Sequence, residues 1–92
     1  MNQLSLLSPS EVQSRFAQVV QSKRKQMKLS RKALAERSTV PASTIKKFET
    51  SGQISLRQFI LLWQCVDSLE HLLAIIDQPQ SHPRTIDEVL KR

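Results

Sequence analysis

Residues 29–49 have the sequence LSRKALAERSTVPASTIKKFE, which contains the signals for two short helices joined by a tight turn. Ser30 is a favoured N-cap for a helix over residues 31–37, because its hydroxyl accepts a bond from a free backbone N–H. Residues 38–40 form the turn. A second helix is predicted over residues 41–50, since proline is favoured at the first helical position, where no N–H donor is needed. Two helices joined this closely cross steeply, and the second can protrude from the core.

The two faces of the predicted second helix differ in chemistry. Ile45 and Phe48 are three residues apart and therefore share one apolar face, which we expect to turn inward. The outward face is small, polar or basic, which suits the major groove of B-DNA, about 12 Å wide. A lysine reaches guanine acceptors, a serine or threonine donates or accepts, and an alanine contacts a thymine methyl. The predicted base-reading residues are Ala42, Ser43, Thr44 and Lys47.

Capping signals place three further helices around this unit. Ser8, followed by proline and by a glutamate three positions on, begins a helix over residues 9–26. Ser55 begins the fourth helix, and Asp67 or Ser68 caps a fifth over residues 69–76. Helical spacing predicts the inward residues Val12, Phe16, Val19, Val20, Met27, Ala33, Leu34, Ala35, Leu56, Phe59, Ile60, Trp63 and Val66.

The sequence therefore predicts an all-α, five-helix domain over residues 9–76, with an N-terminal arm (1–8) and a C-terminal tail (77–92). Residues 72–76 are continuously apolar, so a strand there stays open as an alternative. A helix that is apolar all round either completes the core or forms a dimer or partner interface. The residues in question are Leu69, Leu72, Leu73, Ile75 and Ile76.

Positive charge is concentrated in one part of the chain. Residues 23–47 hold nine basic residues and one acid, a net charge of +8, whereas the whole chain carries +6. Such a window is either a solvated face or the binding site of a polyanion. Arg31 and Lys32 stand at a helix N-terminus, where free N–H groups also favour a phosphate. The predicted phosphate-binding residues are Arg31, Lys32, Lys46 and Lys28.

Composition argues against several other classes of protein. A single cysteine, Cys65, is expected to fill the core, leaves no internal disulfide and fits a reducing compartment. The N-terminus lacks the features of a signal peptide, and no apolar stretch reaches about 18 residues, so we expect a cytoplasmic protein. His71 and His82 are isolated, and no phosphate loop or nucleophile–base pair is evident, so we expect no metal, cofactor or catalytic residue.

The stretch 29–49 resembles the core of the Cro/repressor (Xre-type) helix-turn-helix family, and the likeness covers about residues 12–76. It depends on Ala35, Val40, the run 43–45 and Glu49. The resemblance implies a lambda-repressor-like domain in which Arg24, late in the first helix, pairs with Glu49. It also implies base-reading positions at Ala42, Ser43 and Lys47, and phosphate-contacting positions at Arg31 and Lys46.

Two positions depart from the family pattern. The family often has glutamine where Arg31 stands, and it usually has glycine where Thr39 stands. A β-branched residue with positive φ is costly, so we expect the turn to be built differently here.

Residues 48–56 and 83–90 together resemble HipB-like antitoxins, which are encoded beside HipA-type kinase toxins. The resemblance implies a homodimer that binds operator DNA and represses its own operon together with the toxin. The expected partners are therefore double-stranded operator DNA, a second copy and a kinase toxin. An alternative is an interaction module that neutralises a toxin or another enzyme through its core and tail. A third alternative is a basic helical module for RNA or an anionic membrane. Single-stranded RNA is disfavoured, because the basic window contains no aromatic residue for base stacking.

Overall fold

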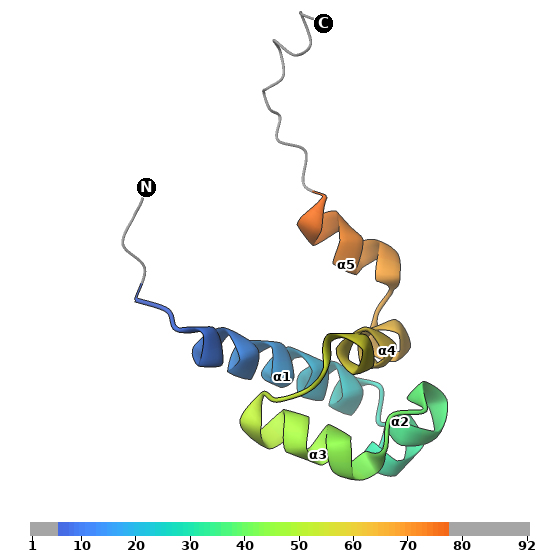
Figure 1. Ribbon diagram of the computed structural model, residues 1–92. Coiled ribbons are helices and arrows are strands. Elements are labelled where there is room, and N and C mark those ends of the chain that lie inside the picture. The colour runs from blue at the N-terminus through green and yellow to red at the C-terminus, as the bar shows by residue number, and fades with distance from the viewer. Residues whose placement is uncertain (1–5, 78–92) are drawn as a thin grey trace, which may run out of the picture.

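The computed structural model of the chain describes residues 6–77, which contain five helices and no strand (Figure 1). The all-α class is therefore confirmed for this part of the chain, and the alternative of a strand over residues 72–76 is wrong. The predicted arm (1–8) lies mostly, and the tail (77–92) almost wholly, outside the described residues. The helices are α1 (Pro9–Gln26), α2 (Arg31–Ser38), α3 (Ala42–Ser51), α4 (Leu56–Val66) and α5 (Leu69–Ile76).

Serine caps begin four of these helices, which confirms the predicted starts. The hydroxyls of Ser8, Ser30, Ser55 and Ser68 each accept a hydrogen bond of 3.0–3.1 Å from the backbone N–H three residues on. α3 differs slightly, because Pro41 is extended (φ −59°, ψ 144°) and takes the N-cap position. The helix therefore begins one residue later than predicted.

The C-terminal end of α3 requires a glycine. Gly52 stops the helix in the left-handed conformation, with φ +80°, and its N–H bonds to the carbonyl of Phe48 at 2.7 Å. A Cβ at this position would lie 3.1 Å from the backbone of Gln13 in α1. The chain therefore leaves α3 at a point where it packs directly on α1.

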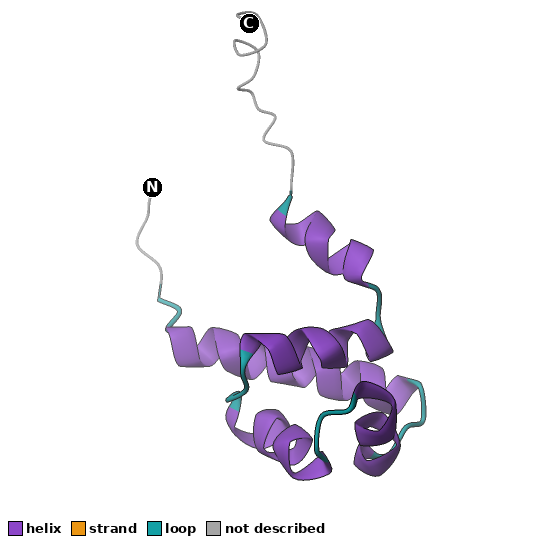
Figure 2. Cartoon of the chain, turned by 45° about the vertical axis from the view of Figure 1, so that its right-hand side comes forward, coloured by secondary structure: helices purple, strands orange, loops and turns teal. Residues whose placement is uncertain are grey.

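α1 and α4 form a central pair, with two helices on one side of it and one helix on the other. Figures 1 and 2 show α2 and α3 on one side of this pair and α5 on the other. The core lies between α1, α2, α3 and α4, and α5 contributes no fully buried residue. The buried apolar residues are Ala17, Val20, Leu34, Val40, Ile45, Phe48, Phe59, Leu62, Trp63 and Val66.

Several residues predicted to be inward are exposed. Phe16, Val19 and Met27 in or just after α1 are 50%, 41% and 43% exposed, and Leu56 at the start of α4 is 73% exposed. Helical spacing identifies an apolar face but not what covers it. Phe16, Val19 and Leu56 all border the side of the α1–α4 pair on which α5 lies, and α5 leaves them open. The fully buried Leu62 was missed.

Candidate nucleic-acid interface

The turn between α2 and α3 is built from a buried serine and a strained threonine. Thr39 has φ 65° and ψ 9°, the left-handed conformation that usually needs glycine, so the expectation of a different turn is wrong. This conformation costs a non-glycine residue about 1–2 kcal/mol. Neighbouring bonds hold it in place: the Thr39 N–H donates to Ala35 O at 2.9 Å, and the Ser38 hydroxyl accepts from Val40 N at 3.1 Å. The Thr39 hydroxyl also donates to the Ser38 carbonyl.

α3 turns its apolar residues inward and its polar residues outward. Ile45 and Phe48 are 0% and 1% exposed, as predicted. Ser43 and Lys47 are exposed, while Ala42 and Thr44 are half-buried at the start of the helix. The four predicted base-reading residues therefore lie within the first two turns of one short helix, and two of them, Ser43 and Lys47, are exposed.

The predicted phosphate-binding residues come from three segments. Lys32 and Lys46 are exposed on α2 and α3, and Arg31 is half-buried at the first position of α2. Lys28 is exposed in the turn after α1, where its φ of 59° makes it a second non-glycine residue in the left-handed region. The basic window thus lies on the last turn of α1, the α1–α2 connection, α2 and α3.

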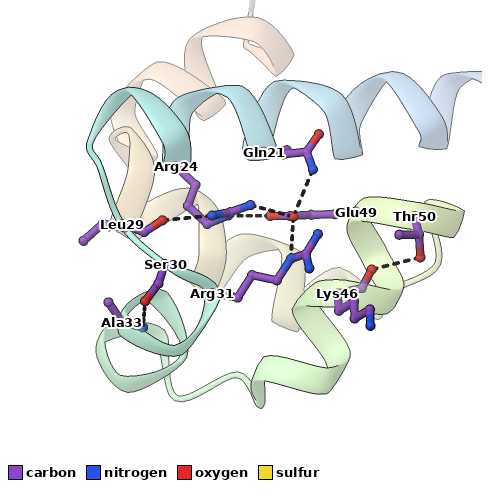
Figure 3. A network of polar contacts seen from close by, with 9 residues as sticks. All are labelled: Gln21, Arg24, Leu29, Ser30, Arg31, Ala33, Lys46, Glu49 and Thr50. Atoms are coloured by element: carbon purple, nitrogen blue, oxygen red, sulfur yellow. Dashed lines mark hydrogen bonds and ion pairs between the residues drawn. The ribbon is translucent and has the colours of Figure 1, made fainter.

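A buried carboxylate joins α1, α2 and α3 (Figure 3). The Glu49 side chain is 0% exposed, and its two oxygens accept bonds of 2.7 and 2.9 Å from Nε and Nη2 of Arg24. Arg31 Nε adds a third bond of 2.9 Å, and Gln21 Nε2 a fourth of 3.3 Å. Arg24 is itself only 6% exposed and also donates from Nη1 to the carbonyl of Leu29 at 2.9 Å. The contact between Arg24 and Glu49 is the one that the family resemblance implied.

Glu49 is charged in this setting. Burial alone would raise its pKa, but hydrogen bonds from Arg24 and Arg31, together with their positive charges, hold the pKa of Glu49 below its ordinary value. Sequence reasoning did not anticipate the bonds from Gln21 and Arg31. Gln21 lies three residues before Arg24, so helical spacing could have placed both on one face of α1. No sequence pattern pointed from Arg31 to Glu49.

A second polar cluster fixes the junction of α4 and α5. Asp67 Oδ2 lies 3.0 Å from Lys23 Nζ in α1 and 2.9 Å from His71 Nδ1 in α5. Hydrogen bonds from His71 and Lys23 lower the pKa of Asp67 to about 2. The indole N–H of Trp63 donates to the carbonyl of Ser68 at 2.9 Å. The start of α5 is therefore tied to α1 and α4 by directed bonds.

An apolar groove of 480 Å³ lies between α1, α4 and α5. Three residues predicted for a dimer or partner interface, Leu72, Ile75 and Ile76, line it. Of the other two, Leu69 packs against the core, and Leu73 is 54% exposed outside the groove. The apolar run of α5 thus completes the core only in part. The remaining lining residues are Phe16, Val19, Leu56, Phe59, Ile60 and Trp63.

Compared with family models, curated proteins and solved structures, the chain matches none of them. Among the described helices, none has both the length and the apolar character needed to cross a membrane. Cys65 is half-buried against the core and is unpaired.

Proposed function

We propose that the protein is a sequence-specific DNA-binding transcriptional repressor with a lambda-repressor-like helix-turn-helix domain. The observation that carries this proposal is the construction of α3. Its apolar residues Ile45 and Phe48 are buried, while Ser43 and Lys47 are exposed on a short helix within a strongly basic segment. A helix presented in this way can enter the major groove with its side chains toward the base edges.

Recognition divides between bases and backbone. Lys47 donates to guanine acceptors, Ser43 and Thr44 donate or accept at base edges, and Ala42 contacts a thymine methyl. Arg31, Lys32, Lys46 and Lys28 neutralise phosphates, which sets the register on the duplex and makes affinity fall with salt.

The proposed repressor is a homodimer. The apolar groove beside α5 lies on the opposite side of the α1–α4 pair from α2 and α3, so a second copy can occupy it while both α3 helices face DNA. A two-fold dimer would present the two helices about 34 Å apart, to successive major grooves of a palindromic site.

Footprinting on the DNA upstream of the coding sequence tests this proposal. The expected result is protection of a pseudo-palindromic site whose half-sites lie one helical turn apart. Titration of that site and of a scrambled duplex at several salt concentrations should give tighter binding to the site and a salt-dependent affinity for both. Equal affinity for the two duplexes at every salt concentration would reject sequence-specific repression.

The uncovered groove also favours a second candidate, an interaction module that neutralises a partner enzyme. The resemblance to HipB-like antitoxins makes a kinase toxin the proposed partner, and part of that resemblance lies in residues 83–90, outside the described residues. Deletion of residues 78–92 tests whether the two functions use different parts of the chain. Retained DNA binding with loss of toxin binding would place the two functions on separate surfaces of one protein. A kinase-like reading frame beside this gene would support the antitoxin role.

A further inference from the structure

Among the cations predicted to bind phosphate, Arg31 has a distinctive setting. Its Nε donates to the buried carboxylate of Glu49 at 2.9 Å, while its side chain remains 34% exposed. Within residues 6–77, neither of its two terminal amino groups makes a hydrogen bond. The guanidinium is thus held at one nitrogen and open at the other two.

The charges in the network leave Arg31 in excess. Arg24 and Glu49 neutralise each other through two hydrogen bonds, and Nη1 of Arg24 donates to the Leu29 carbonyl. Arg31 then adds a positive charge for which the network holds no second carboxylate. Arginine presents its donors in a rigid fork that matches two oxygens of a phosphate.

We propose that Glu49 is a positioning residue for DNA backbone binding. It holds Arg31 by Nε, so that Nη1 and Nη2 face a phosphodiester of the bound duplex. Because Glu49 belongs to α3, the same carboxylate sets this phosphate contact relative to the base-reading helix. The inference rests on the proposed function and assigns a DNA-binding role to a side chain that is itself 0% exposed. Ordering a flexible side chain before binding corresponds to about a 2- to 10-fold gain in affinity.

A double-mutant cycle tests this role, with a 25-base-pair duplex of random sequence at low salt as the probe. We expect Arg31→Ala to weaken binding and to reduce the salt slope by about one. Glu49→Gln keeps an acceptor but loses the charge, and it should weaken binding about 2- to 10-fold in the natural background. In the Arg31→Ala background its effect should fall below about 2-fold, because there is no guanidinium left to orient. A merely structural role for Glu49 predicts equal losses in both backgrounds, and that result would overturn the proposal.

A second variant keeps the test decisive if Glu49→Gln does not fold. Arg31→Lys keeps the charge but cannot bond to Glu49 through Nε and still present a fork. We expect it to lose most of the affinity that Arg31→Ala loses. The matched control is Arg57→Lys, the same exchange at an exposed arginine of α4 outside the proposed DNA-binding residues, and it should bind as the natural protein does. Natural affinity in Arg31→Lys would overturn the proposal. If the natural protein binds no duplex at low salt, the proposed function itself fails, which is a different outcome from binding without coupling.

Discussion

The two sides of the α1–α4 pair, one carrying α2 and α3 (the α3 side) and the other α5 (the α5 side), differ in how well their apolar residues are covered. On the α3 side, two arginines and a glutamine satisfy the buried carboxylate of Glu49, and the apolar residues Ile45 and Phe48 are covered. On the α5 side, Ile75 and Ile76 are 59% and 68% exposed and border an open apolar groove. The apolar residues of the first side are covered within one chain, whereas those of the second have the character of a surface that a partner covers.

Removal of the buried carboxylate should have the largest effect, because it leaves a buried arginine unpaired on the α3 side. Glu49→Ala leaves Arg24, only 6% exposed, without its partner. We expect a loss of about 3–5 kcal/mol in the free energy of unfolding, measured by urea denaturation. Glu36→Ala, on the exposed face of α2, is the matched control and should change stability by less than about 0.5 kcal/mol. Similar denaturation midpoints for the two variants would contradict this account of the network.

A charge in the groove should weaken the proposed dimer contact on the α5 side without unfolding the domain. Ile76→Asp places a carboxylate in the proposed dimer contact. The variant loses the burial of the Ile76 side chain in the dimer, which contributes about 1.5–3 kcal/mol to the free energy of association. Dimerisation should weaken by at least about tenfold in sedimentation equilibrium. Leu73→Asp tests the face of α5 outside the groove and should have a smaller effect. Equal dissociation of both variants would move the interface away from the groove.

Base reading by α3 should respond to Lys47→Ala. We expect a loss of about 1–3 kcal/mol on the operator and relaxed discrimination, measured by titration against operator and scrambled duplexes. Lys32→Ala removes a proposed phosphate contact on α2, so it should weaken both duplexes alike and lower the salt slope by about one. Equal losses of Lys47→Ala on both duplexes would count against its base-reading role.

The smallest predicted effect concerns the turn that positions α3. Thr39→Gly relieves the left-handed strain at φ 65° and should raise the free energy of unfolding by about 0.5–1 kcal/mol. Thr39→Ala keeps a Cβ in the same conformation, so its stability should stay within about 0.5 kcal/mol of the natural protein. Thermal unfolding of the two variants measures the difference. If Thr39→Ala raises stability as much as Thr39→Gly, then relief of backbone strain does not explain the gain.

Helix positions were predictable because their signals are local. Each serine cap acts on an N–H three residues away, and Ile45 and Phe48 share a face through helical spacing alone. The outward position of Ser43 and Lys47 followed from the same spacing. The turn was less predictable: the strain at Thr39 is tolerated because Ser38 and Ala35 bond to the surrounding backbone, which composition does not reveal.

The sequence by itself determined the first four helices to within about one residue, the serine caps at Ser8, Ser30 and Ser55, and the concentration of positive charge along residues 23–47. Those properties depend on neighbours within about one helical turn. Only the tertiary structure decided that Glu49 is also bound by residues 28 and 18 positions away, and that Phe16 and Leu56 face an open groove. Such contacts depend on how helices pack, because a periodic pattern specifies an apolar face without specifying which segment, or which molecule, covers it.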